Sequence, residues 1–267
     1  MSSSTRVVVT DLDGTLWEGD EVVPAATVAA IHELRRRGIE LLVATGRRLR
    51  AATRGLAPAG LAPPAVLLSG AIGADLATGD EWHRLAFDAA TGAAVLQAFR
   101  NANLEPVAYL GTASVDAIAG PNCSTTDAHI ASFGPWLQRG APDEVVASGR
   151  AVGFGIIGVD EDTLRGVAAV LDGLASNWLG PDITYGGATL MVGPAGVEKV
   201  DGIRTWTQRR GIDPSQVMAI GDGSNDLAML EWAGTAVAMP SHDPRVTAAA
   251  DHHLDGPSHW ASVLDLV

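Results

Sequence analysis

The 267-residue chain carries 31 acidic and 18 basic side chains, a formal net charge of −13 at pH 7, and 47% of its residues are apolar. The charge excludes an extended basic face, so neither a nucleic acid nor an anionic membrane surface is an expected partner. The apolar content allows a sizeable core, and the length suits one large domain or a core with a smaller insertion. A lone Cys123, no signal-peptide pattern and no membrane-length apolar run favour a cytoplasmic globular protein.

The first third of the chain alternates strand and helix patterns. Residues 6–10, Arg-Val-Val-Val-Thr, predict a buried parallel strand. Residues 24–37 predict a helix that has Pro24 in its first turn and stops at Gly38. Two further strands are expected, at 39–44 and 65–69.

The pattern changes between about residues 80 and 186, where glycine and turn residues are more frequent. Strands are expected at 106–110, 152–159 and 183–185, helices at 89–101 and 162–174, and hinge-like turns near 75–80 and 186–187. The segment is therefore predicted to be an α+β module inserted into an α/β core. This division assigns residues 1–79 and 187–267 to the core and 80–186 to the inserted module.

The strand and helix alternation returns near the C-terminus. Helices are expected at 198–210, 224–232 and 243–250, and strands at 217–221 and 235–239. Strands that alternate with helices of 10–15 residues indicate βαβ units and a parallel sheet.

Two carboxylates follow the first predicted strand, in Asp11-Leu12-Asp13-Gly14-Thr15. Side chains two apart on an extended strand end point to the same side, and like charges so close need a cation or a shared proton. A solvated acidic turn is the alternative for a bare Asp-x-Asp pair. A calcium loop is excluded, because Leu16 stands where that loop requires glycine.

A second acidic cluster, Gly221-Asp222-Gly223-Ser224-Asn225-Asp226, lies between a predicted strand and a predicted helix. Asp222 and Asp226 could face one ion from this turn, and their hard oxygen atoms suit Mg²⁺. A helix N-cap explains one of these aspartates but not the whole cluster.

Two further sequence features could bind a phosphate group. Thr45-Gly46-Arg47 ends the second predicted strand, where a hydroxyl, a glycine amide and a helix start can cradle a phosphate. Taken alone, this motif fits an ordinary strand-to-helix turn better. Lys199 is the only lysine among the 18 basic residues. Its compact ammonium can contact a carboxylate and a phosphate together, which favours a functional position over a solvated one. In open α/β sheets the carboxyl ends of the strands meet at one edge, so these groups are expected to converge there.

These motifs resemble the four motifs of the haloacid dehalogenase (HAD) superfamily. Their order and spacing are similar to those of Cof-type sugar phosphatases, which carry an inserted α/β (type C2) cap. The resemblance covers the whole chain, with strong matches over about residues 6–48 and 189–255, while the insert matches only in position and size. It implies a Rossmann-like parallel-sheet core with an inserted α+β cap domain. One departure from the family pattern is Ser69, where asparagine is usual.

The resemblance also implies roles for the motif residues. Asp11 is expected to be the nucleophile that forms an aspartyl-phosphate, and Asp13 the general acid and base. The expected contacts to the phosphate come from Thr45, Gly46, Arg47, Lys199 and Asn225, with Thr45 and Lys199 counted among the catalytic residues. The expected Mg²⁺ ligands and their supports are Asp11, Asp13 through its carbonyl, Asp222, Asn225 and Asp226.

The implied enzyme is a phosphoric monoester hydrolase: a Mg²⁺-dependent phosphatase acting on a small phosphorylated metabolite, a sugar phosphate above all. A phosphomutase of the same superfamily and a non-catalytic phosphometabolite-binding protein are the alternatives. Either a monomer or a homodimer is compatible with the sequence. The run Gly153-Phe154-Gly155-Ile156-Ile157-Gly158 matches a dinucleotide-binding pattern, but its apolar residues favour a glycine-containing strand.

Overall fold

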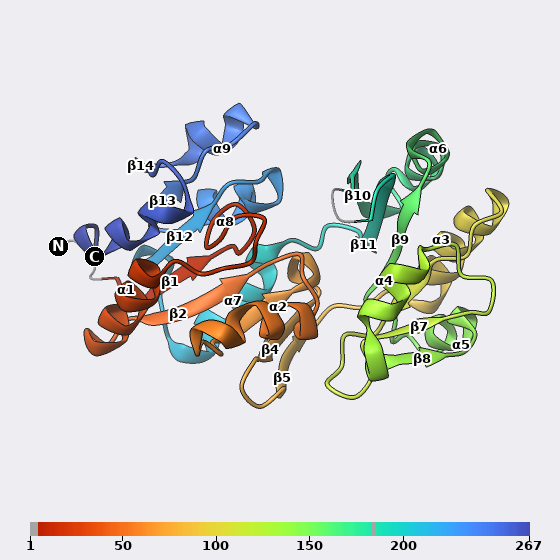
Figure 1. Ribbon diagram of the computed structural model, residues 1–267, viewed down its shortest axis with the longest axis horizontal. Helices are drawn as coiled ribbons and strands as arrows, with labels where there is room; N and C mark the ends of the chain where they lie inside the picture. Colours follow the sequence, from red (N-terminus) through yellow and green to blue (C-terminus); the bar gives the residue numbers. More distant parts are fainter. Residues whose placement is uncertain (1–4, 183–184) are drawn as a thin grey trace. The chain divides into compact units, whose positions relative to one another are not determined.

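The computed structural model describes residues 5–182 and 185–267, and Figure 1 traces its helices and strands along the chain. The chain divides into two compact units. The core unit comprises the residues up to His83 together with Glu198–Val267, and the inserted unit comprises Arg84–Val197. Each unit is built around a sheet of its own.

The sheet of the core unit has eight strands in the order β14-β13-β12-β1-β2-β3-β4-β5. Strand β1 (Val7–Thr10) pairs in parallel with β2 (Glu40–Ala44) and with β12 (Val217–Gly221). All four residues of β1 are buried, as a continuous β-branched run predicts for a strand covered on both faces. The other strands are β3 (Pro64–Leu67), β4 (Ile72–Asp75), β5 (Glu81–Arg84), β13 (Thr235–Ala238) and β14 (His252–His253).

Helices bury both faces of this sheet. From α7 (Lys199–Arg210), Val200, Ile203 and Trp206 pack in one apolar cluster with Val7 and Val9 of β1. The other α-helices are α1 (Ala25–Arg36), α2 (Leu49–Leu56), α8 (Leu227–Trp232) and α9 (Pro244–Ala249). Single 3-10 turns span Ala57–Ala59, Leu68–Gly70, Pro214–Gln216 and Ser224–Asp226, and a longer 3-10 helix spans Pro257–Asp265.

The strand register brings three motifs to one edge of the sheet. Thr10, the last residue of β1, is aligned with Val43 of β2 and with Ile220 of β12. Because the three strands are parallel, the residues that follow them emerge at the same carboxyl edge. Buried Trp260 braces this edge: its Nε1–H donates to the Thr10 hydroxyl (3.1 Å), which donates to the Asp11 carbonyl (2.9 Å).

The inserted unit has a six-stranded sheet in the order β10-β11-β9-β6-β7-β8. Strand β9 (Gly153–Val159) runs antiparallel to β11 and to β6, and its Phe154 and Ile156 pack in the apolar cluster of this unit. The remaining strands are β6 (Val107–Tyr109), β7 (Ala117–Ala119), β8 (Leu137–Arg139), β10 (Ala175–Pro181) and β11 (Ala188–Pro194). Its helices are α3 (Ala89–Asn101), α4 (Asp127–Ser132), α5 (Pro142–Ala147), α6 (Glu161–Leu171) and the 3-10 turn Gly134–Trp136.

The expected fold class, a parallel α/β core with an inserted mixed module, is confirmed. The glycine-rich run 153–158 lies within strand β9, as its apolar residues indicated. The strand expected at 65–69 ends earlier, at Leu67, because Leu68 and Ser69 turn into the left-handed region with φ of 48° and 54°.

The expected hinge at Gly186 and Gly187 belongs instead to the turn of the β10–β11 hairpin, where both glycines have positive φ. Leu190 and Val192 of β11 pack in the inserted unit, so the chain returns to the core unit only at Glu198. The strand expected at 183–185 begins at residues outside the described part of the chain. The limits 79–80 and 186–187 remain predictions of where the two units can be separated.

No helix among residues 5–182 and 185–267 combines the length and the apolar character needed to cross a bilayer.

Gly70 is expected to be indispensable for the fold of the core unit. Its φ is +114°, and a Cβ there would lie 2.1 Å from the carbonyl oxygen of Glu198, which leads into α7. Left-handed strain and overpacking together predict that Gly70→Ala lowers the free energy of unfolding by roughly 2–5 kcal/mol. Urea unfolding measures this loss.

Gly60→Ala is the matched control, because Gly60 also has a positive φ (70°) but no atom within 4 Å of the added Cβ. It should cost only the left-handed strain, roughly 1–2 kcal/mol. Equal losses in the two variants would show that the close approach of Gly70 to Glu198 is unimportant.

Candidate active site

A buried ion pair joins the two chain segments that make up the core unit. The Lys199 ammonium donates to Asp11 Oδ1 over 2.9 Å and to Asp226 Oδ1 over 2.7 Å. Lys199 is only 1% exposed, and Asp226 is fully buried. Lys199 is therefore not a solvated surface lysine: its ammonium lies between two buried carboxylates, and its functional role stays a prediction.

Local sequence explains how Lys199 reaches this place. Lys199 is the first residue of α7, and a reciprocal capping box joins Glu198 and Asp201 around it. The carbonyl of Glu198 lies against Gly70, where only glycine leaves enough room. The start of α7 is thus fixed both by its own cap and by the turn that follows β3.

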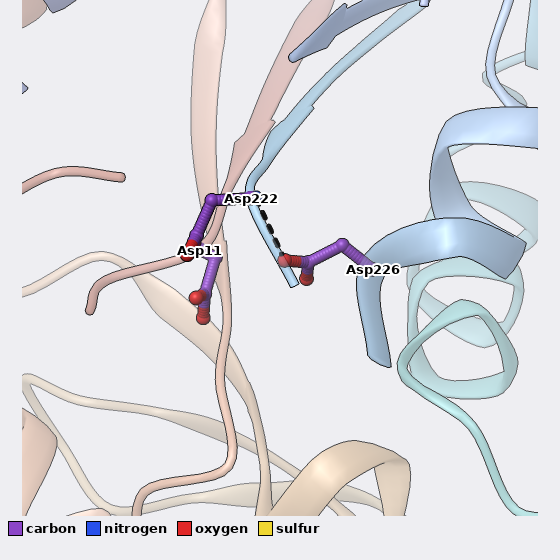
Figure 2. Close-up of side chains that lie close together, drawn as sticks. All are labelled: Asp11, Asp222 and Asp226. Atoms are coloured by element: carbon purple, nitrogen blue, oxygen red, sulfur yellow. Dashed lines mark hydrogen bonds between the residues drawn. The ribbon is translucent and has the colours of Figure 1, made fainter. Parts of the chain in front are cut away.

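Asp226 is held by the turn between β12 and α8. Its Oδ2 accepts hydrogen bonds from the amides of Asp222 (3.1 Å) and Gly223 (2.9 Å), and Figure 2 draws the first of these. A Cβ on Gly221 would lie 2.5 Å from the Cβ of Asp226, so glycine is required at that position. With its second oxygen bound to Lys199, Asp226 is fully engaged in holding the site together.

Asp222 is oriented by the turn that follows β1. The Thr15 hydroxyl donates to Asp222 Oδ1 over 2.8 Å, and a Cβ on Gly14 would lie 2.5 Å from Asp222 Oδ2. Gly14 has a φ of 76°, which also favours glycine. The first and second acidic motifs therefore fit against each other through Thr15 and Gly14.

Asp11, Asp222 and Asp226 form a group suited to a cation. One carboxylate oxygen from each lies within 4.8 Å of the others, and Figure 2 shows the three side chains converging. When all three are ionised, the Lys199 ammonium, which pairs with Asp11 and Asp226, offsets one of the three charges and leaves an excess of two. Hard oxygen ligands with this charge fit a divalent ion such as Mg²⁺.

The same burial shifts the protonation of the site. Burial raises the pKa of Asp11 to about 7, although the Lys199 ammonium opposes the shift. Burial also raises the pKa of Asp222 to about 6, against the hydrogen bond from Thr15. For Lys199 burial favours the neutral form, but the charges of Asp11 and Asp226 outweigh it and raise its pKa. Lys199 therefore keeps its positive charge while the nearby carboxyl groups titrate.

The remaining phosphate-cradle residues lie at the end of β2. Thr45 is buried, its amide donates to the Val66 carbonyl (2.9 Å), and its hydroxyl accepts from the Arg47 amide (3.2 Å). Gly46 is exposed, and a Cβ there would lie 3.4 Å from Ser69 Oγ. These residues form a turn whose glycine is exposed, and phosphate binding there stays a prediction.

Three more expected site residues, Asp13, Arg47 and Asn225, lie outside the carboxylate group. The Asp13 side chain pairs with Arg47, whose Nη2 is 2.6 Å from Oδ1. Arg47 also pairs with Glu21, a residue that the sequence analysis did not single out because an acidic residue in a polar loop carries no signal. Asn225 is exposed, and its Oδ1 lies against Gly223.

Comparison with known proteins extends these observations. Residues 8–265 match the family of haloacid dehalogenase-like hydrolases. A phosphoglycolate phosphatase from Natronomonas pharaonis is 34% identical over 125 residues, which cover 42% of this chain and 53% of that protein. A phosphoglycolate phosphatase from Methanopyrus kandleri is 27% identical over 251 residues, which cover 94% of this chain and 91% of that protein.

A solved structure has the same fold along its whole length. It is a HAD/Cof-like hydrolase from Plasmodium vivax, with a TM-score of 0.76 and 20% identity, covering 99% of this chain and 97% of that one. The family match confirms the family expected from the four motifs and the expected enzyme class, a phosphoric monoester hydrolase. The chain belongs to the haloacid dehalogenase-like hydrolases.

Proposed function

We propose that this chain is a Mg²⁺-dependent phosphatase that releases inorganic phosphate from a small phosphorylated metabolite, with a sugar phosphate as the substrate class. The observation that carries the proposal is Asp11, a buried carboxylate at the carboxyl edge of the sheet, paired with the only lysine and grouped with two further aspartates. The phosphatase names of the relatives, phosphoglycolate phosphatase and the pyridoxal phosphate phosphatase of Escherichia coli, support a small phosphorylated substrate.

In this proposal each residue has a chemical role. An Asp11 oxygen attacks phosphorus and forms an aspartyl-phosphate. Asp13 protonates the departing oxygen and then takes a proton from the attacking water. Lys199 offsets negative charge on Asp11 and on the transferring group.

Further residues hold the phosphoryl group and the metal. Thr45, the Gly46 amide and Asn225 bind the phosphoryl oxygens in the proposal. Mg²⁺ would be held by Asp11, Asp222 and the Asp13 carbonyl, with Asp226 and Asn225 in support. When bound, the metal supplies positive charge that stabilises the ionised form of Asp11 and offsets the negative charge of the phosphate oxygens. Arg47 was expected at the phosphate too, but its contacts are with Asp13 and Glu21.

A phosphomutase and a non-catalytic binding protein are the other functions compatible with the sequence. The products distinguish them from a phosphatase. A mutase converts a sugar phosphate into its isomer with little free phosphate, and a binding protein leaves the ester intact. Release of inorganic phosphate from a panel of sugar phosphates in the presence of Mg²⁺ tests the proposed function directly.

Asp11→Asn is expected to remove activity, since the amide is a poor nucleophile and binds metal weakly. The predicted loss in kcat for 4-nitrophenyl phosphate is at least about 10³-fold. Asp255→Asn is the control, because Asp255 is an exposed aspartate of the same unit and should leave kcat unchanged. Substantial turnover by Asp11→Asn would contradict the assigned nucleophile.

Metal binding is expected to depend on pH through the two raised carboxyl pKa values. Mg²⁺ must displace protons from Asp11 (pKa about 7) and Asp222 (pKa about 6). Stabilisation by saturating Mg²⁺, measured as the shift in thermal midpoint, should therefore be larger at pH 8 than at pH 5.5.

Without metal, the stability of the folded chain should depend on pH in the opposite direction. A carboxyl whose pKa is higher in the folded than in the unfolded chain holds its extra proton only when folded. The free energy of unfolding should thus fall as pH rises from about 4 to about 7. Asp11→Asn should flatten this fall. A Mg²⁺ shift that is the same at both pH values would mean that the ion binds elsewhere.

A further inference from the structure

The guanidinium of Arg47 faces carboxylates on two sides. Nε donates to Asp13 Oδ2 over 2.7 Å and Nη2 donates to Oδ1 over 2.6 Å, which makes a two-point contact. Nη1 lies 2.7 Å from Oε1 of Glu21. Each of the three nitrogens therefore faces an acidic side chain.

A buried indole completes the surroundings of Asp13. Trp17 donates its Nε1–H to Asp13 Oδ1 over 3.0 Å, and the Cζ of Arg47 lies 5.1 Å from the Trp17 ring centroid. Trp17 is fully buried and packs on α2 at Gly55, where a Cβ would lie 2.8 Å from the ring. The indole N–H thus has a fixed position from which to orient Asp13.

These contacts, and not packing, determine the orientation of Asp13. Its side chain is 52% exposed, so few neighbours restrict it sterically. Glu21 has a φ of 56°, a conformation that costs roughly 1–2 kcal/mol for a residue with a Cβ. Its side chain pairs with Arg47 from this conformation. Arg47 itself follows the Thr45-Gly46 turn, so it ties that turn to the segment from Asp13 to Glu21.

We propose that Arg47 is a positioning residue that, together with Trp17 and Glu21, holds the Asp13 carboxyl in the orientation needed for proton transfer, and that it does not bind the phosphoryl group. The proposal rests on the proposed function, in which Asp13 is the acid and base. A two-point guanidinium contact fixes both the position and the plane of a carboxylate, which a single lysine contact does not.

The proton follows a balanced path in this scheme. As the bond from Asp11 to phosphorus forms and the ester P–O bond breaks, the proton of the Asp13 carboxyl moves to the departing oxygen. Water then attacks the phosphorus of the aspartyl-phosphate and gives its proton to the Asp13 carboxylate. The bond to Asp11 breaks, and Asp11 leaves as a carboxylate. Poor orientation of Asp13 hinders the first step most when the departing oxygen is strongly basic.

Two substrates of similar size separate positioning from phosphate binding. Benzyl phosphate releases a basic alkoxide that needs a proton, whereas 4-nitrophenyl phosphate releases a stable phenolate. The ratio kcat/KM reports every step up to departure of this group. Arg47→Lys keeps the positive charge but loses the two-point contact, so it should lower kcat/KM for benzyl phosphate about 100-fold and for 4-nitrophenyl phosphate less than about 5-fold.

Three further variants sharpen the test. Glu21→Gln and Trp17→Phe each remove one support of the arrangement while leaving Arg47 in place. Both should produce the same selective loss on benzyl phosphate, of about 10-fold. Arg54→Gln is the control, because Arg54 is an exposed arginine on α2. This substitution should leave kcat/KM unchanged for both esters. Thermal midpoints of all variants show whether a loss of activity reflects unfolding.

Equal losses on both substrates, together with weaker inhibition by inorganic phosphate, would show that Arg47 binds the phosphoryl group and would overturn the proposal. Undiminished benzyl phosphate turnover in both Arg47→Lys and Glu21→Gln would overturn it as well. If the unaltered chain with Mg²⁺ releases phosphate from neither ester nor from a sugar-phosphate panel, the proposed function itself fails. The two kinds of failure are therefore distinguishable.

Discussion

The site depends on one buried ion pair, that between Lys199 and the carboxylates of Asp11 and Asp226. Lys199 and Asp11 are 188 residues apart in the sequence, and the entire inserted unit lies between them along the chain. Removing the ammonium would leave two buried carboxylates without their counter-charge, at a cost of roughly 3–5 kcal/mol. The site therefore exists only when both segments of the core unit have folded together.

This arrangement also explains how a chain with a net charge of −13 can handle an anionic group. The positive charge is local: one ammonium pairs with two of the three grouped carboxylates, and the excess negative charge favours a divalent ion. In the proposed function that ion and Lys199 together face the phosphoryl group. A single phosphate group needs only these few contacts.

The parts of the site that the sequence predicts are those whose residues belong to recognisable local sequence patterns. Strand ends, glycines at tight turns and a lone lysine all carry signals, and they identified Asp11, Asp222, Asp226 and Lys199. Contacts made by long side chains across loops carry none, so the pairing of Arg47 with Glu21 was not foreseen. Gly186 and Gly187, expected near a hinge, lie in the turn of the β10–β11 hairpin. Two left-handed glycines suit a hinge and a hairpin turn equally well, and only strand pairing distinguishes them.

In the proposed function, Asp11 carries the phosphoryl group during turnover. Trapping tests it most directly: the chain is mixed with Mg²⁺ and excess 4-nitrophenyl phosphate, quenched with acid during turnover and treated with borohydride, which reduces an acyl phosphate to an alcohol. Peptide mass spectrometry is expected to find homoserine at position 11 in place of aspartate, and to find it nowhere else. Phosphate release with aspartate at position 11 unmodified, or reduction at another carboxylate, would contradict the account.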